Sequence, residues 1–313
     1  MSQHSGVSVE KIAYKGWPNC YRVGNGTVEL IVTGDVGPRV MRYGFTGGAN
    51  LFKEFEEQMG GRGEKELRLR GGNRLWLAPE DPVASWMPDN EAVAITPSAK
   101  GLIARGPIEK QTGLQKELEI TMDSSGSGVT VAHRLWNRSL FPQEYSAWVL
   151  TMMAPGGLAV AGLPPRGAHP RDLAPTNPLT LWAYTDLSDA RFRITRRHLA
   201  LRQKAGDVPP QKIGSFSPDT WIGYFLGGQL FVKRAKASRE QRYPDYGCSL
   251  ELFTNGEFTE IETLGPLARV APGAAAVQVE RWSLFDKVRE PEATDAALDA
   301  VFKPILGRKE TAL

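Results

Sequence analysis

The chain has 313 residues and carries 38 Lys and Arg against 35 Asp and Glu, so its formal net charge is only +3. A balance this even gives no electrostatic signal for a nucleic acid or a membrane surface, and we expect neither as a partner. Apolar residues (41%) and charged residues (23%) occur at the frequencies of a globular protein.

Signals for a cofactor or for targeting are missing from the sequence. Cys20 and Cys248 are too few for a disulfide framework and too far apart for a zinc site. We find no phosphate loop, no dinucleotide-binding glycine motif and no nucleophile elbow, so we expect no cofactor and no metal. Residues 1–6 lack the apolar segment of a signal peptide, and no apolar run approaches the roughly 18 residues of a membrane span. We therefore expect a cytoplasmic protein, with a periplasmic location left open if a leader has been removed.

The 33 glycines, the 22 prolines and the scarcity of helical periodicity predict many short strands joined by turns. The first clear strands are 28–33, which follows an Asn25-Gly26 turn signal, and 40–45. The charged, glycine-rich segment 54–70 is expected to be a surface loop or a lid.

The stretch 71–80, GGNRLWLAPE, follows that loop. Its two glycines permit a close approach of the backbone. Asn73, Arg74 and Trp76 are side chains suited to gripping a polyhydroxylated ligand, because they combine hydrogen-bond donors with a flat apolar surface.

A lysine, Lys116, lies on the apolar face of a predicted strand. The segment 114–122 alternates, except that Lys116 lies among its apolar residues. Such a lysine is either a snorkelling side chain or a pocket cation, and the residues leave both open. Lys212 and Lys233, on later short strands, are weaker candidates for a pocket cation. His133 lies between apolar neighbours, where a core histidine is expected.

The middle of the chain contains one long apolar segment. Residues 145–153 are apolar on both faces and predict a central strand that is covered on both sides, with Trp148 in it. Residues 155–180 are rich in Gly, Pro and Ala, and we expect a long connecting loop there. A short strand is expected next, at 182–184.

The late run 258–264 carries two carboxylates in a pattern that predicts a strand. Residues two apart in a strand share a face, so Glu260 and Glu262 point the same way as Phe258 and Leu264. A carboxylate on a largely apolar face is costly unless it is paired, hydrogen-bonded or open to a pocket. Both glutamates are therefore candidate functional residues.

The end of the chain contains the last long strand, expected at 276–285, and a helix expected at 294–302, which Thr294 can cap. No fixed-period repeat is present. Because the pattern of strands and turns continues on both sides of 155–180, we expect a single domain, 1–313, with its core at about 10–287. The expected fold is all-β: a large antiparallel β-sandwich with one or two short helices.

Several of these segments together resemble the galactose mutarotase-like superfamily. They are the Asn-Arg pair after glycines at 73–74, the strand EIET at 260–263, the Pro272-Gly273 turn and the final strand ending in WSLF at 282–285. The resemblance covers roughly residues 10–287, and the stretches 71–80 and 148–157 favour a bacterial branch that lacks the usual catalytic histidines. Members of the superfamily are β-supersandwich proteins that bind sugars, and many are aldose 1-epimerases.

The resemblance also implies roles for particular residues. Mutarotases use a carboxylate as general base on the anomeric hydroxyl and a histidine as general acid on the ring oxygen. By its position in the late strand Glu262 matches the carboxylate, and Asn73 with Arg74 resembles the pair that binds the sugar. The histidines do not carry over, since the central strand here has Tyr145-Ser-Ala-Trp148 where the family has His. Lys116 or another cation is then expected in place of the acid.

The sequence thus predicts a carbohydrate-active protein that rearranges a sugar by acid–base chemistry near the anomeric carbon, as aldose 1-epimerases do. The expected catalytic residues are Glu262 and Lys116. The expected substrate-binding residues are Asn73, Arg74, Trp76, Trp148, Lys212 and Glu260. A non-catalytic carbohydrate-binding protein is the second hypothesis, because the histidine is missing. A lyase or hydrolase acting on an acidic sugar is the third, because lysine and arginine suit an anionic ligand.

Overall fold

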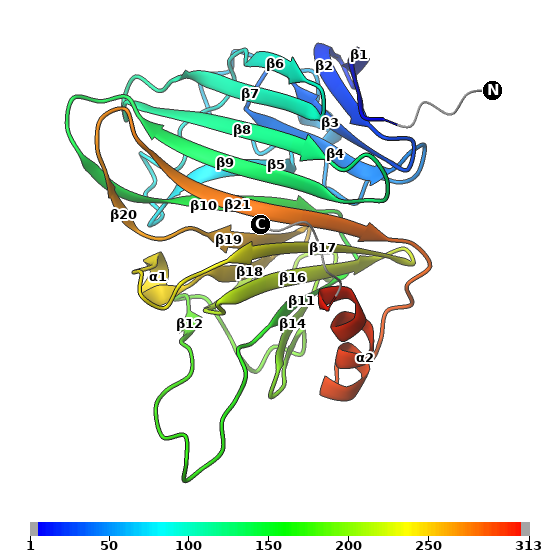
Figure 1. The fold of residues 1–313 in the computed structure, drawn as a ribbon, viewed down its shortest axis with the longest axis vertical. Helices are drawn as coiled ribbons and strands as arrows, with labels where there is room; N and C mark the ends of the chain where they lie inside the picture. The colour runs from blue at the N-terminus through cyan, green and yellow to red at the C-terminus, as the bar shows by residue number, and fades with distance from the viewer. Residues whose placement is uncertain (1–5, 308–313) are drawn as a thin grey trace.

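Two antiparallel β-sheets packed face to face make up the protein (Figure 1). The computed structural model describes residues 6–307, and over that range it contains one sheet of 11 strands and one of 10. The all-β sandwich predicted from the sequence is confirmed. Within residues 6–307, no helix is both long and apolar enough to cross a membrane.

The first sheet has the predicted acid strand near its middle. In spatial order its strands are β1 (Ser8–Tyr14), β2 (Trp17–Gly24), β3 (Val28–Thr33), β4 (Arg39–Phe45), β5 (Gly72–Ala78), β10 (Gln143–Met153), β19 (Thr259–Leu264), β18 (Leu250–Thr254), β15 (Gln211–Ser215) and β12 (Leu179–Leu181). A short strand, β20 (Ala268–Val270), pairs with the first residues of β10.

The second sheet covers the first over most of its length. In spatial order its strands are β13 (Phe192–Ile194), β14 (His198–Arg202), β11 (Leu158–Gly162), β16 (Asp219–Leu226), β17 (Gln229–Lys236), β21 (Ala275–Phe285), β9 (Val129–Asn137), β8 (Leu114–Met122), β7 (Gly101–Ile108) and β6 (Ala94–Ser98).

The hydrophobic core lies between the two sheets, because alternate residues of their strands point inward. In β8 and β9 every second residue is buried among apolar neighbours, as the alternation in the sequence predicts. In β10 all residues from Tyr145 to Met153 are buried, which confirms a central strand covered on both faces. The outer face of β10 is therefore also covered by other side chains. These side chains and the outer face of β10 form the candidate site.

The expected loop at 155–180 is wrong in part, because β11 lies within it. Its five residues, Leu158–Gly162, are buried, and the strand pairs with β14 on one side and β16 on the other. Glycine is needed at its end, since a Cβ on Gly162 would collide with the indole of Trp221. The small residues that suggested a loop thus allow close packing, and the loop itself is 163–178, the long green connection in Figure 1.

Two short segments also differ from expectation. The strand expected at 182–184 is a turn, in which the N–H of Thr185 donates to the carbonyl of Trp182 (2.9 Å), and the strand β12 precedes it. The short element α1 (Pro244–Gly247) contains two residues with left-handed backbone angles, so it is a tight turn rather than a regular helix.

The C-terminal helix α2 (Asp295–Leu306) packs against the outer face of the second sheet (Figure 1). Thr294 caps it as predicted, because its side chain accepts a hydrogen bond from the N–H of Ala297. The helix continues four residues beyond the predicted end at Phe302. Its buried residues, Leu298, Phe302 and Ile305, contact apolar residues of β11, β14, β16 and β17.

Candidate functional site

The site is built on the five neighbouring strands β5, β10, β19, β18 and β15 of the first sheet. Leu150 of β10 lies opposite Arg74 of β5 on one side and opposite Glu262 of β19 on the other. Glu251 of β18 is in turn opposite Glu262. Because residues paired across strands share a face, these side chains form one row across the outer face of the sheet.

A cavity of about 370 Å³ lies over this row. Its volume is in the range of small-molecule binding sites. Aromatic side chains make up much of its wall, and four charged side chains, Arg74, Glu80, Lys212 and Glu260, face it. The lining residues are Leu67, Leu69, Arg74, Trp76, Glu80, Trp86, Trp148, Leu150, Tyr184, Lys212, Phe253, Asn255, Phe258 and Glu260.

Glu260 is the carboxylate of the acid strand that reaches the cavity. Its Oε1 accepts a hydrogen bond from Nη2 of Arg74 at 3.3 Å. Burial raises the pKa of Glu260 to about 7; the positive charge of Arg74 opposes this rise and the negative charge of Glu262 adds to it. At neutral pH this carboxyl group can therefore both accept and return a proton.

Glu262 lies two residues further along β19, is fully buried and is not part of the cavity lining. Its Oε2 accepts a hydrogen bond from the indole Nε1 of Trp148 at 2.7 Å and another from Nζ of Lys212 at 3.1 Å. The two side chains that hold Glu262 both line the cavity. The residue expected to be the base is thus held one layer behind the surface that a ligand would touch.

Lys212 connects the cavity to a buried acidic cluster. Its Nζ lies 2.8 Å from Oε2 of Glu251 and 3.1 Å from Oε2 of Glu262, and it stands over the rings of Trp148 and Trp182 at 4.6 Å and 4.7 Å from their centroids. Burial alone would lower the pKa of Lys212, but the two glutamates outweigh it and raise that pKa well above its usual value. Lys212 is therefore a positively charged hydrogen-bond donor at the wall at neutral pH.

Arg74 offers donors that the protein itself leaves unused. Its guanidinium stacks over the ring of Trp76, 4.0 Å from the centroid, and Trp76 in turn meets Trp148 edge to face at 5.5 Å. Within the described part of the chain, Nε and Nη1 of Arg74 have no hydrogen-bond partner. A ligand hydroxyl in the cavity can accept from these groups, and such a contact would offset the cost of burying them.

Asn73 does not join Arg74 in the cavity, contrary to the expected sugar-binding pair. Adjacent residues of a strand point to opposite faces, so Asn73 points into the space between the sheets. There its Nδ2 donates to Oγ1 of Thr151 at 3.0 Å, and its Oδ1 lies 3.0 Å from Nε2 of His133. His133 is fully buried, as expected of a core histidine, and burial lowers its pKa to about 4.

The contacts of Asn73 belong to an inter-sheet network that includes Asn73, His133, Thr151, Lys233, Thr263, Glu280 and Trp282. Lys233 and Glu280 are fully buried and form an ion pair at 2.7 Å. Thr151 accepts from Lys233 at 3.2 Å, and Glu280 accepts from Thr263 at 2.5 Å. Lys233, which the sequence suggested as a pocket cation, therefore lies between the sheets in an ion pair and does not line the cavity.

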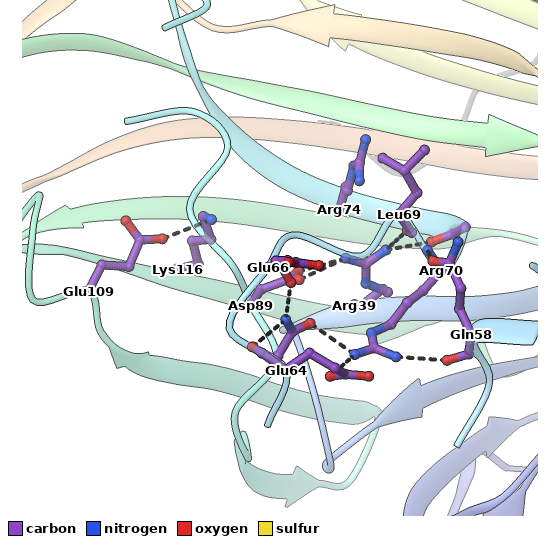
Figure 2. A network of polar contacts seen from close by, with 12 residues as sticks. Arg39, Gln58, Glu64, Glu66, Leu69, Arg70, Arg74, Asp89, Glu109 and Lys116 are labelled. Carbon is purple, nitrogen blue, oxygen red and sulfur yellow. Dashed lines mark hydrogen bonds and ion pairs between the residues drawn. The ribbon is translucent and has the colours of Figure 1, made fainter. Parts of the chain in front are cut away.

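Lys116 also lies away from this cavity. Its Nζ pairs with Oε1 of Glu109 at 2.8 Å (Figure 2), and Glu109 lines a different cavity, of about 330 Å³, together with Asp89. The sequence left open a snorkelling side chain or a pocket cation. In the structure Lys116 is not a cation in the cavity of Glu260, because it is buried and paired with Glu109.

The loop expected at 54–70 is held down beside the cavity by two buried arginines (Figure 2). Arg39 donates to both oxygens of Asp89 and to the carbonyls of Leu69 and Gly71. Arg70 donates to the carbonyl of Gln58, to Glu64 and to Asn90. These contacts fix the end of the loop, which supplies Leu67 and Leu69 to the cavity wall.

Several residues of the site were not identified from the sequence. Glu251 could have been placed, because the Asn255-Gly256 turn signal predicts a hairpin that brings 251 opposite 262 once the length of the turn is known. Glu80, Tyr184 and Asn255 come from loops, for which no periodicity indicates a direction. Among residues 6–307, no histidine lines the cavity, and no group of three or more His, Cys, Asp or Glu side chains is arranged to hold a metal ion.

The fold and the site together define an antiparallel β-sandwich protein with an aromatic, carboxylate-bearing cavity on the outer face of one sheet. No family model and no curated protein sequence matches the chain. Solved structures do match its fold. A candidate aldose 1-epimerase from Klebsiella pneumoniae subsp. pneumoniae matches with a TM-score of 0.58 at 14% identity, covering 96% of this chain and 87% of that one.

Two further structures agree. A galactose mutarotase-like protein from Lactobacillus casei matches with a TM-score of 0.56 at 8% identity, covering 85% of this chain and 100% of that one. A candidate mutarotase from Salmonella typhimurium matches with a TM-score of 0.54 at 10% identity, covering 91% and 95%. The chain therefore has the galactose mutarotase-like fold, as the sequence motifs indicated. At such identities the likeness is one of fold, and the function has to be argued from the site.

Proposed function

We propose that the cavity binds a carbohydrate and that the protein rearranges it by acid–base catalysis near the anomeric carbon. The observation that carries this proposal is the buried carboxyl group of Glu260 at the wall of a cavity with an aromatic lining, where burial raises its pKa to about 7. A general acid–base group is most effective when its pKa lies near the working pH. Aromatic faces and hydrogen-bond donors together suit a sugar, which has apolar C–H faces and a rim of hydroxyls.

In the proposed reaction Glu260 takes the proton of the anomeric hydroxyl while the bond between the anomeric carbon and the ring oxygen breaks. The ring oxygen takes a proton from the ammonium group of Lys212, which leaves an open-chain aldehyde. After rotation of the aldehyde, the ring closes on its other face, and both protons return to the groups that exchanged them. Arg74 would hold hydroxyls with its unused donors, and Trp76 and Trp148 would contact the apolar face of the ring.

The second candidate function is carbohydrate binding without catalysis. It is supported by the ion pairs that hold Lys212 between Glu251 and Glu262, because a proton donor with a strongly raised pKa releases its proton reluctantly. In that case Glu260 only accepts hydrogen bonds from hydroxyls. A lyase or hydrolase for acidic sugars has less support, since Arg74 and Lys212 each already face a carboxylate and leave no uncompensated positive charge for an anion.

Anomer exchange measured by NMR on glucose, galactose and mannose tests the proposal. We expect the protein to accelerate exchange of at least one of them, and Glu260→Gln to slow it by about 10² to 10⁴-fold while binding persists. Binding of a sugar without acceleration over buffer would favour the binding protein. The absence of any binding would contradict both functions.

A further inference from the structure

The mouth of the cavity has two aromatic side chains that are far more exposed than the rest of its wall. Trp86 is 45% exposed and Tyr184 is 43% exposed, whereas Trp76 and Trp148, deeper in the same cavity, are 6% and 3% exposed. Exposed apolar surface that adjoins a cavity is typical of a ligand-binding surface. The two rings therefore extend the aromatic lining of the cavity outward to solvent.

The turn that holds Trp86 is fixed by its own hydrogen bonds. Asp81 Oδ1 accepts from the N–H groups of Val83 (2.8 Å) and Ala84 (2.7 Å), and Ser85 Oγ donates to the carbonyl of Leu77 (2.7 Å) in β5. The indole Nε1 of Trp86 then donates to Oε1 of Glu80 at 2.9 Å. The ring is thus held in one orientation before any ligand arrives, which reduces the entropy lost on binding.

The turn that holds Tyr184 is fixed in a similar way. The N–H of Trp182 donates to Oγ1 of Thr185 at 2.9 Å, and that hydroxyl donates to the carbonyl of Lys212 in β15. Tyr184 lines the same cavity as Trp86 and Glu80, so the two turns border one opening. Trp86, Glu80 and Tyr184 therefore form one patch at the mouth.

We propose that this patch is a second sugar subsite, so that the ligand is the end of an oligosaccharide whose terminal unit occupies the cavity. The inference rests on the proposed function, because it assumes that the cavity itself takes a sugar. A carboxylate bonded to one aromatic ring, with a second ring lining the same cavity, matches a sugar unit, whose C–H face stacks on aromatics while its hydroxyls donate to an acceptor. The patch is continuous with the cavity, since all three residues also line it.

Calorimetric titration of the full chain with sugars of increasing length tests the subsite. The probes are glucose, galactose and mannose and their 1,4-linked di- and trisaccharides, in α and β linkage. In at least one series we expect the disaccharide to bind more tightly than the monosaccharide. Trp86→Ala should weaken the disaccharide by roughly 2- to 10-fold more than it weakens the monosaccharide, whereas Trp86→Phe should retain most of the gain.

Two further variants make the result specific. Tyr184→Ala, on the other turn, should reproduce the selective loss, and Phe141→Ala, which removes another exposed ring away from the cavity, should change neither affinity. Equal affinities for mono- and disaccharides in every series, or an equal loss of both in Trp86→Ala, would overturn the subsite while monosaccharide binding and anomer exchange still support the proposed function. If no sugar of any length binds, both proposals are wrong.

Discussion

Glu260 and Glu262 leave the same face of β19 two residues apart, yet Glu260 faces the cavity while Glu262 is bonded to Trp148 and Lys212 behind its wall. The difference arises from their neighbours across the sheet. Glu262 lies between β10 and β18 with an indole and an ammonium group directly over it, whereas Glu260 has the single, longer contact to Arg74 at 3.3 Å. In the proposed reaction the two carboxylates therefore have different roles: Glu260 exchanges protons, and Glu262 holds the cation Lys212 in place.

The first prediction concerns pH. Anomer exchange should rise with pH and reach half of its maximum near pH 7, because Glu260 accepts a proton only when ionised. The folded state holds this proton to about pH 7, whereas the unfolded chain releases it near pH 4.5. The protonated carboxyl group of Glu260 therefore stabilises the folded state fully below pH 4.5, and this stabilisation is lost as the pH rises to about 7. Urea unfolding of wild type and Glu260→Gln between pH 5 and 8 checks this.

The test is the direction in which the difference in free energy of unfolding between wild type and Glu260→Gln changes with pH. Relative to Glu260→Gln, the wild type should become less stable as the pH rises across this window. A stability difference that is independent of pH would contradict the raised pKa of Glu260.

The second prediction is a pair of opposite shifts in the pH profile. Arg74→Met removes the positive charge that lowers the pKa of Glu260, so the midpoint of the profile should move up. Glu262→Gln removes a negative charge that raises it, so the midpoint should move down. The midpoint of anomer exchange against pH in the two variants measures both shifts. Movement in the same direction would show that Glu260 is not the titrating group.

The third prediction separates two buried lysines. Lys212→Met should abolish sugar binding and also destabilise the protein, because Glu251 and Glu262 lose their shared cation; breaking a buried pair costs about 3–5 kcal/mol. Lys116→Met breaks the pair with Glu109 but should leave sugar affinity unchanged, since Lys116 lies away from the cavity. Titration calorimetry with urea unfolding distinguishes the two effects.

Two results would alter this assignment. If Lys116→Met weakens sugar binding as much as Lys212→Met does, the cation assignment is wrong. If Lys212→Met does not fold, the double variant Lys212→Met/Glu251→Gln, which removes one charge of each sign, is measured in its place.

The fourth prediction concerns the inter-sheet network. Lys233→Met leaves Glu280 buried without its cation and should lower the free energy of unfolding by about 3–5 kcal/mol. Adding Glu280→Gln should recover part of the loss, because the amide oxygen can still accept from Trp282. The control is Lys236→Met on the same strand, whose partner Asp219 is exposed and whose removal should cost at most about 1 kcal/mol. Equal losses for Lys233→Met and Lys236→Met would contradict the role of the network.

Strand periodicity determined which parts of the site could be predicted. The shared face of Glu260 and Glu262 and the central position of β10 follow from a period of two and from an apolar run, and both are confirmed. The same rule argues against using Asn73 and Arg74 together in one cleft, although the motif places them side by side in the sequence. A resemblance between sequences pairs neighbours along the chain, whereas the sheet separates them onto two faces.

Other parts of the site and of the fold could not be predicted without the three-dimensional structure. Lys116 lies on an apolar face, but the sequence does not show which cavity that face meets. β11 was hidden because Gly and Ala serve close packing there rather than a loop. Glu80 and Tyr184 come from turns. The first turn is held by Ser85, which donates to the carbonyl of Leu77 in β5, and the second by Thr185, which donates to the carbonyl of Lys212 in β15, so their directions depend on contacts that no periodicity shows.

The inter-sheet network restricts which changes of sequence this protein can tolerate during evolution. Each of Asn73, Thr151 and Thr263 is the chain neighbour of a residue in the row under the cavity. Shifting β5 by one residue would bury a guanidinium between the sheets and turn an amide outward, so we expect single insertions that shift the register of these strands to be destabilising. New ligand preferences are then most easily acquired in the turns that hold Trp86 and Tyr184, which can lengthen while the sheet beneath them stays as it is.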